Sequence, residues 1–355
     1  MQRPALMRFA LGVGALMVVT LTLTACGSGA TQEQAKAPKS SAPKDSPIAN
    51  ETGWLAYQTG QVDFMTDEVH LVRVDGSRDH VIATNLPGRK GHPDFSRDGS
   101  RLAFDQTTDG AADQIYISKA NGSDAKRVAH CKLPDCLSYW EPAWSPDGSR
   151  LAISTASGPL DEQTGPASLG LAIIDVKSEK VTQIVEHEGA QTQDHFARWS
   201  PDGKRLVFWR AKYEADGTVQ QTAVFIVNID GSGLRRLTPW NMLAGDPDWS
   251  PNGNLILFST RPLFDFDTSG RSELYTMRPD GSGMHKLTSY GEDGPRATQP
   301  RWTPDGKAIL YTRLPQAGSP RHIWGIDRTG HEDVPVLTAA PIYTHPILQR
   351  EQKIK

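Results

Sequence analysis

A short segment recurs along this chain about every fifty residues. Five copies align on an aromatic residue just before a tight turn: HPDFSRDGSRLAF (92–104), EPAWSPDGSRLAI (141–153), FARWSPDGKRLVF (196–208), DPDWSPNGNLILF (246–258) and QPRWTPDGKAILY (299–311). The aromatic residues Phe95, Trp144, Trp199, Trp249 and Trp302 are spaced by 49, 55, 50 and 53 residues. Such a period is typical of proteins built from one repeated supersecondary unit.

A second motif, built around an Asp/Asn-Gly-Ser turn or a relative of it, accompanies the first. It occurs six times, starting at Arg73, Lys119, Ile174, Asn228, Arg278 and Gly325. The Pro and Gly residues suit tight turns, and the apolar residues between the turns alternate as they do in strands. Each unit therefore predicts four short strands. Six such units predict an all-β fold, a six-bladed β-propeller with four-stranded blades.

The first unit has no strand with a repeat aromatic ahead of it. The end of the chain offers one, because THPILQREQKIK (344–355) resembles GHPDFSRDGSRL (91–102) in its His-Pro opening. We expect residues 345–349 to form the innermost strand of blade one. This C-terminal strand would complete that blade, join the two ends of the chain and remove an exposed sheet edge.

Residues 1–25 have the plan of a signal peptide. Arg3 and Arg8 precede an uncharged apolar run of 17 residues that ends at Ala25, and this run is short for a transmembrane helix. The sequence Leu-Thr-Ala-Cys at 23–26 resembles a bacterial lipobox, which implies that Cys26 is lipidated. A plain signal peptide that happens to end beside Cys26 is the alternative.

Residues 26–50 follow as a segment rich in Ala, Ser, Pro, Gln and Lys, which cannot bury apolar surface. We interpret them as the lipidated Cys and a disordered tether, and residues 51–355 as the propeller. This organisation predicts a protein anchored by lipid to the bacterial cell membrane and facing outside the cytoplasm, at the extracellular face or in the periplasm.

The charge balance argues against a nucleic-acid partner. Removal of residues 1–25 takes away two arginines, which leaves 36 Lys+Arg against 41 Asp+Glu and a formal net charge of −5. Basic runs are absent from the sequence. We expect a monomer whose partners are other envelope proteins and, through the anchor, the membrane.

Two further cysteines, Cys131 and Cys136, lie five positions apart. In an exported protein such a pair is most simply a disulfide that clamps a loop. The spacing does not fit a C-x-x-C redox site, and no second pair completes a zinc cage. Two free thiols remain an alternative.

The repeats resemble a known family. Trp-Ser-Pro-Asp-Gly followed by Leu-Ala-Phe, then Asp-Gly-Ser and Leu-Thr, is similar to the propeller repeat of TolB and its relatives, over about residues 51–355. The resemblance implies the β-propeller fold and favours a role in the cell envelope.

One position of the repeat is expected to stand at the mouth of the central channel. It lies three residues before the aromatic residue and is occupied by His92, Glu141, Phe196, Asp246, Gln299 and, through ring closure, His345. His195 precedes Phe196. Imidazole and carboxylate groups around one axis suit a divalent metal or a small ligand. The alternative is a polar funnel whose groups bond to neighbouring backbone and water.

Aromatic residues also gather in or beside the predicted loops at the mouth. They are Tyr139, Trp140, Trp209, Trp240, Phe264 and Tyr290. Such residues are enriched in binding hot spots, so we interpret this face as a candidate partner-binding surface, with local packing as the alternative.

The sequence favours a binding or scaffolding module over an enzyme, and it predicts no cofactor. No G-x-S-x-G nucleophile motif occurs. The alternative is a metal-dependent carbohydrate-binding or oligogalacturonate-lyase-like propeller that uses the predicted mouth residues. Oligogalacturonate lyases share this repeat type, and the resemblance implies a metal held by Gln299, His92 and His345, although the closely spaced His pair of that family is missing here.

Overall fold

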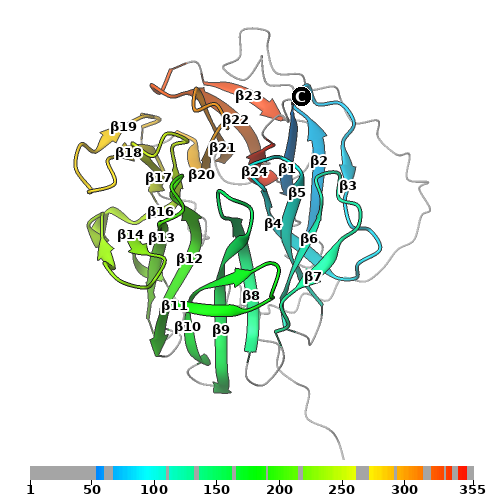
Figure 1. Cartoon of the computed structure of the whole chain (residues 1–355). Coiled ribbons are helices and arrows are strands. Elements are labelled where there is room, and N and C mark those ends of the chain that lie inside the picture. Colours follow the sequence, from blue (N-terminus) through cyan, green and yellow to red (C-terminus); the bar gives the residue numbers. More distant parts are fainter. Residues whose placement is uncertain are drawn as a thin grey trace, which may run out of the picture.

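The computed structural model describes residues 53–59, 67–108, 112–131, 136–161, 165–188, 191–214, 219–260, 272–291, 294–314, 321–331, 333–337 and 343–349. Six four-stranded antiparallel sheets surround a central axis, as the blades of a propeller do (Figure 1). The predicted six-bladed β-propeller is therefore confirmed. The predicted signal peptide, Cys26 and tether lie outside the described residues. Nowhere in the described ranges is there a helix with the length and apolarity to cross a membrane.

The strands follow chain order from the axis outwards in every blade except the first, whose innermost strand comes from the C-terminus. Blade one contains β24 (Tyr343–Leu348), β1 (Trp54–Thr59), β2 (Glu68–Arg73) and β3 (His80–Val81). Blade two contains β4 (Arg89–Phe95), β5 (Arg101–Thr107), β6 (Gln114–Lys119) and β7 (Lys126–Val128). Blade three contains β8 (Cys136–Trp144), β9 (Arg150–Asp161), β10 (Gly165–Asp175) and β11 (Val181–Glu188).

The other three blades repeat this plan. Blade four contains β12 (Thr192–Trp199), β13 (Arg205–Tyr213), β14 (Val219–Asn228) and β15 (Arg235–Arg236). Blade five contains β16 (Ala244–Trp249), β17 (Ile256–Thr260), β18 (Leu274–Met277) and β19 (His285–Lys286). Blade six contains β20 (Arg296–Trp302), β21 (Ala308–Leu314), β22 (His322–Asp327) and β23 (Val334–Leu337). A one-turn 3₁₀ helix, η1 (Trp240–Met242), links blades four and five.

The C-terminal strand closes the ring as predicted. β24 pairs antiparallel with β1, and Leu348 lies opposite Leu55. The Gln349 N–H donates to the carbonyl of Trp54 (2.8 Å), and the Gln349 side chain donates to the carbonyl of Gly99 in blade two (2.6 Å). Both ends of the described chain therefore meet in blade one.

In blades two to six the innermost strand turns into the second strand through nearly identical hairpins, and we call this end of the propeller the hairpin end. In blade three the Asp147 carboxylate accepts hydrogen bonds from the Ser145 hydroxyl (2.6 Å) and the Ser149 N–H (3.0 Å). These bonds lower the pKa of Asp147 to about 2, the Ser145 hydroxyl contributing most. Gly148 has φ of 68°, a value that favours glycine. The Pro-Asp-Gly pattern is thus explained by this turn.

The core lies between blades. Trp199 of blade four packs with Leu171 and Val185 of blade three in one buried cluster. At the edge of such clusters an arginine at the start of the second strand covers the repeat tryptophan of the next blade. Arg101 lies 4.1 Å from the ring centre of Trp144, and the pattern recurs for Arg150 over Trp199 (4.8 Å) and Arg205 over Trp249 (5.1 Å).

Deletion of residues 341–355 should lower the melting temperature by about 10 °C or more. The deletion removes β24, exposes the edge of β1 and takes the buried Leu348 out of the core. Differential scanning calorimetry measures the change. Deletion of residues 351–355 alone is the matched control and should leave the transition in place. Equal melting temperatures for both deletions would contradict closure by this strand.

Candidate functional site

Six equivalent residues, one within each innermost strand, form a ring that we call the mouth. Each has φ between 48° and 57°, unusual for residues other than glycine: His92, Glu141, Phe196, Asp246, Gln299 and His345. At each of these positions the pairing with the second strand shifts register, as in a β-bulge. Five of the six precede a proline, which cannot donate to the ladder and is tolerated at a bulge.

The bulge leaves the N–H of the ring residue to be satisfied from the neighbouring blade. A side-chain oxygen of the preceding blade accepts it at five junctions. The donor and acceptor pairs are His92 and Gln58 (3.1 Å), Glu141 and Asp105 (2.9 Å), Phe196 and Glu141 (2.9 Å), Gln299 and Asp246 (3.2 Å), and His345 and Gln299 (3.2 Å). Polar groups at the mouth therefore hold adjacent blades together.

Three aromatic rings from different blades meet at the axis. The His345 ring stacks on Phe196 with 5.0 Å between centroids, and it meets His92 edge-on at 4.7 Å. The rings of His92 and Phe196 are 5.3 Å apart. Phe196 is only 5% exposed. These rings meet at the centre of the mouth, while the polar groups around them bond to neighbouring backbone, as the alternative of a polar funnel predicts.

The pKa values of the two histidines of this cluster are shifted in opposite directions. Burial opposes protonation of His92, but the carboxylates of Asp105, 2.6 Å from Nδ1, and of Glu141 outweigh it and raise the pKa of His92. Burial and the neighbouring His92 lower the pKa of His345 well below its usual range. A neutral His345 accepts a hydrogen bond at Nε2 from the Gln299 side chain (2.8 Å).

Glu141 is the ring carboxylate with the most polar contacts among the described residues. It accepts hydrogen bonds from the Ser154 hydroxyl (2.6 Å) and the Phe196 N–H, and its Oε1 lies 3.3 Å from Nδ1 of His195. Burial disfavours the charged carboxylate, but His195 and the other partners outweigh burial and lower the pKa of Glu141. His195 is itself 3% exposed and stacks on Trp209.

The predicted mouth residues therefore come together, but they are not arranged as a metal centre. Among the described residues no group of three or more His, Cys, Asp or Glu side chains is placed to hold a metal ion. The carboxylates of Asp105, Glu141 and Asp246 already accept hydrogen bonds from the protein. The described residues thus lend no support to the metal-dependent alternative.

A second ring of charges lies one step further into the channel, and sequence reasoning missed it. Asp94 accepts the N–H of Trp144 (2.8 Å) and forms an ion pair with Arg198 of blade four (3.0 Å). Asp248 accepts the N–H of Trp302 in the same way (2.8 Å).

Arg301 completes the buried ring. It donates to the carbonyl of Pro300 (2.9 Å), and burial together with Arg198 lowers the pKa of Arg301 to about 10. A usable signal was present in the sequence, because Asp94, Arg198, Asp248 and Arg301 each stand directly before a repeat aromatic.

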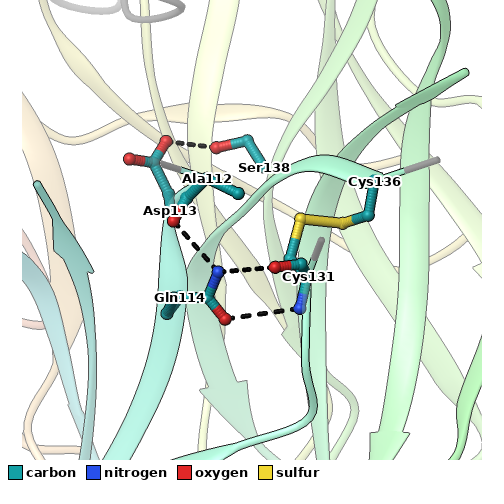
Figure 2. The surroundings of a disulfide bond; sticks show 6 residues. All are labelled: Ala112, Asp113, Gln114, Cys131, Cys136 and Ser138. Carbon is teal, nitrogen blue, oxygen red and sulfur yellow. Dashed lines mark hydrogen bonds between the residues drawn. A yellow bond between two sulfur atoms is a disulfide. The ribbon is translucent and has the colours of Figure 1, made fainter. Parts of the chain in front are cut away.

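Cys131 and Cys136 form a disulfide between blades two and three, with Cα atoms 5.1 Å apart (Figure 2). The side chain of Gln114 donates to the Cys131 carbonyl (2.9 Å) and accepts from the Cys131 N–H (3.3 Å). The Ser138 hydroxyl donates to Asp113 beside this bond. The disulfide thus ties the connection that precedes β8 to blade two.

The predicted aromatic face needs one correction. Trp209 is fully buried under Phe196, Ala211 and Tyr213, because it lies in the second strand of blade four and not in a loop. It therefore cannot anchor a partner. Phe264 lies outside the described residues.

The remaining predicted aromatic residues, Tyr139, Trp140, Trp240 and Tyr290, are half-buried. The Lys212 ammonium (4.5 Å) and the Arg236 guanidinium (5.4 Å) both contact the Trp240 ring. The Tyr290 hydroxyl bonds to that of Tyr311 (2.6 Å).

The family model of the TolB beta propeller domain matches residues 171–348, half of the chain. The chain belongs to the TolB β-propeller family. It is 28% identical to the uncharacterized peptidase YuxL of Bacillus subtilis over 167 residues, which are 39% of this chain and 24% of YuxL. It is 31% identical to the Tol-Pal system protein TolB of Francisella tularensis subsp. mediasiatica over 97 residues, 27% of this chain and 19% of that TolB.

The fold agrees with solved members of the family. TolB from Acinetobacter baumannii superposes with a TM-score of 0.61 at 15% identity, over 84% of this chain and 67% of that one. The match to the curated relatives spans at most a quarter of their length. The fold of this chain is therefore that of the TolB β-propeller family.

The double variant Cys131→Ser/Cys136→Ser should lose about 2 kcal/mol of unfolding free energy, because the disulfide constrains a short loop of the unfolded chain. Chemical denaturation compares the variant with the oxidised protein. The oxidised protein treated with a reductant should unfold like the double variant. Identical unfolding curves for oxidised protein and double variant would contradict a structural role.

Glu141→Ala should cost about 3–5 kcal/mol, since it leaves the Phe196 N–H unpaired and His195 without its carboxylate. The equivalent Asp246→Ala is the matched control. Among the described residues it removes two longer hydrogen bonds, from Ser259 (3.1 Å) and the Gln299 N–H (3.2 Å), and the attraction of Asp246 to Arg301, and it should cost less. Denaturant unfolding measures both. An equal or smaller loss at Glu141 would contradict its central role.

Proposed function

We propose that the protein is a lipid-anchored, extracytoplasmic β-propeller that binds another protein of the bacterial cell envelope and acts as a scaffold, not as an enzyme. One observation carries this proposal: the polar groups at the mouth are committed to holding blades together. Catalysis needs groups that can change partners during a reaction, whereas Glu141 and Asp105 each satisfy a backbone N–H of the next blade. Binding of a partner protein by the surrounding surface does not require these groups to change their hydrogen-bond partners.

The family supports the same reading. Relatives with this repeat include a protein named as the Tol-Pal system protein TolB. The binding of other proteins is therefore a reasonable role for this chain. The match covers the propeller repeats and not the whole relative, so membership of that particular system is not part of the proposal.

The direction of the first described strand indicates which face a partner would meet. Gly53 and Gln349 lie at the hairpin end, because Gln349 bonds to Trp54 and Gly99 there. In the proposal, residues 27–50 lead from Cys26 to this end, and a flexible chain of that length has a reach of roughly 25–30 Å. The mouth would then face away from the membrane, towards a partner.

The half-buried aromatic residues around the mouth suit such a contact. Trp240 and Tyr290 follow the outermost strands of blades four and five, where the chain returns to the mouth end. The Trp240 indole contacts two cations and packs against Phe225, and these contacts hold the ring in place. Rigid aromatic groups of this kind dominate the energetics of many interfaces.

Site-directed photo-cross-linking in living cells tests the proposal. A benzophenone side chain is placed at Gln191 or Ser289, exposed at the mouth end, and at Lys204 or Lys307, exposed at the hairpin end. Irradiation should give an adduct of one defined mass from the mouth positions only. The same adduct should be lost when Trp240→Ala is combined with the mouth probe.

Each contrary result has a clear meaning. Adducts of equal yield from both ends would contradict a partner-binding face at the mouth. The absence of adducts from all positions would contradict the scaffold itself. Lys204 and Lys307 are suitable controls because their side chains, like those of Gln191 and Ser289, are exposed.

A further inference from the structure

Two exposed apolar side chains occupy equivalent positions in adjacent blades. Leu234 is 42% exposed and Met284 is 40% exposed, the highest values for large apolar side chains among the described residues. Each follows the Asp-Gly-Ser-Gly turn that leads into the outermost strand of its blade, β15 or β19. The other four blades have Asp79, Ala125, Glu179 and His331 at this position. The large exposed apolar side chains are therefore a feature of blades four and five.

The turns that carry these side chains lie at the hairpin end. In blade four, Asn228 at the end of β14 pairs with Arg205 at the start of β13, and β18 pairs with β17 in the same way in blade five. The Ile229 N–H donates to the carbonyl of Lys204 in the hairpin of blade four (3.1 Å). The turn before Leu234 is thus in direct contact with that hairpin.

A side chain of blade four joins the two turns. The Arg235 guanidinium donates to the carbonyls of Pro279 (2.8 Å) and Asp280 (3.1 Å) in the turn of blade five. Leu234 adjoins Arg235 in the sequence, and Met284 follows the turn that Arg235 contacts. We call this surface the four–five patch and define it by Leu234, Met284, Lys204, Arg235, Arg236 and Arg278.

The segments that build the patch carry an excess of positive charge. Residues 200–205, 228–236 and 278–286 contain six Lys and Arg residues against three carboxylates. Lys286 forms an ion pair with Glu273 (3.0 Å), so five of these cations remain against the three carboxylates. This local excess occurs in a chain with a formal net charge of −3.

The three carboxylates stabilise their own turns. The side chains that accept a backbone N–H there, at 3.1, 3.0 and 2.8 Å, are those of Asp202, Asp230 and Asp280. The side chains of Lys204, Arg236 and Arg278 are exposed. Arg278 donates to the Ser282 hydroxyl (3.5 Å) and Arg236 contacts the Trp240 ring, but neither partner is charged. The patch thus presents cations beside two apolar side chains.

The patch lies across the axis from the point where the described chain begins. Blade one holds Gly53 and Gln349 at the hairpin end, and in a ring of six blades it stands opposite blade four (Figure 1). In the proposed function, residues 27–50 connect Cys26 to Gly53. The anchor keeps the patch at a high effective concentration near the membrane, so contacts that are weak by themselves suffice to hold it there.

We propose that the four–five patch binds the anionic phospholipid surface of the membrane that holds the anchor. This inference rests on the proposed function and adds a second contact with the membrane. Exposed Lys and Arg side chains are attracted to anionic headgroups, and Leu and Met side chains are stabilised by burial at the headgroup boundary. The anchor and the patch then hold opposite sides of the hairpin end, and the mouth faces away from the membrane.

A fluorescent label on the patch tests this contact. Cys26 is lipidated in the proposal and the other two cysteines form a disulfide, so an introduced cysteine is a free thiol. Full-length lipoprotein with Leu234→Cys or Met284→Cys is labelled with the dye NBD and reconstituted into vesicles of phosphatidylcholine, with or without phosphatidylglycerol. Phosphatidylglycerol should raise NBD emission about twofold or more at both positions, because the dye enters the headgroup region. Ser289→Cys, exposed at the mouth end of blade five, is the control and should show no rise.

Charge reversal tests whether the cations are responsible. In protein labelled at Leu234→Cys, Lys204→Glu/Arg278→Glu should lower the emission with phosphatidylglycerol to the level with phosphatidylcholine alone. Lys204→Arg/Arg278→Lys conserves both charges and should keep the rise. An increase of NaCl from about 0.1 M to about 1 M shortens the Debye length from about 10 Å to about 3 Å and should remove most of the rise.

Several outcomes would overturn the inference. They are equal emission in both kinds of vesicle, an equal rise at Ser289→Cys, and a rise that survives Lys204→Glu/Arg278→Glu. A protein adduct from Lys204 in the cross-linking experiment would also overturn it, because a protein and not lipid would then cover the patch. Flotation with phosphatidylcholine vesicles tests the anchor separately. Protein that does not float contradicts the anchor and this inference with it, whereas protein that floats without a rise in emission contradicts this inference alone.

Discussion

The backbone N–H at each bulge of an innermost strand is the group on which the propeller depends. The bulge removes this N–H from its own sheet, and an unpaired buried donor costs about 1–3 kcal/mol. A side-chain oxygen from the preceding blade accepts it at five junctions. Neighbouring blades are also joined by apolar packing, by cation–π contacts and by further hydrogen bonds, such as those from the N–H groups of Trp144 and Trp302 to Asp94 and Asp248. These hydrogen bonds therefore set how each blade sits against the next.

The requirement explains which residue types occupy the ring. Where the ring residue is Glu141, Asp246 or Gln299, it supplies the acceptor itself, and a hydroxyl from the second strand orients it. Where the ring residue is a histidine, the acceptor comes from the second strand. Gln58 serves in the blade of His345, and Asp105 in the blade of His92. In each of these blades, either the ring residue or a residue of the second strand accepts the N–H of the next blade. Where the second strand supplies the acceptor, the imidazole ring lies at the centre of the mouth.

The ring and its closure were accessible from the sequence, whereas the contacts across the axis were not. The spacing of Trp144, Trp199, Trp249 and Trp302 determines the number of blades, and the His-Pro opening near residue 345 predicts the closing strand. Periodicity places one residue per blade at the mouth, but it does not tell which side chains meet there. The stacking of His345 on Phe196 joins blades one and four, which are far apart in the chain.

The misplacement of Trp209 has a similar cause. The residues that follow it in the sequence, such as Arg210 and Lys212, are largely polar and charged, as they would be in a surface loop. The strand β13 continues beyond the position where the repeat aligns, however, and carries Trp209 opposite His195, under the ring. Asp94, Arg198, Asp248 and Arg301 show the reverse case. Their positions are regular in the repeat, but the sequence alone does not reveal that they compensate one another in a buried channel.

These constraints separate the part of the molecule that can vary in function from the part that cannot. Changing Glu141 or Asp105 removes the acceptor of a neighbouring blade, so selection for a ligand at the centre of the mouth conflicts with assembly of the ring. Side chains such as Trp240 stand outside this network of backbone acceptors. Their charge and shape can change without loss of an inter-blade N–H bond. The same fold can therefore occur in relatives that carry different names. In this protein, we expect the residues that surround the mouth to bind the partner.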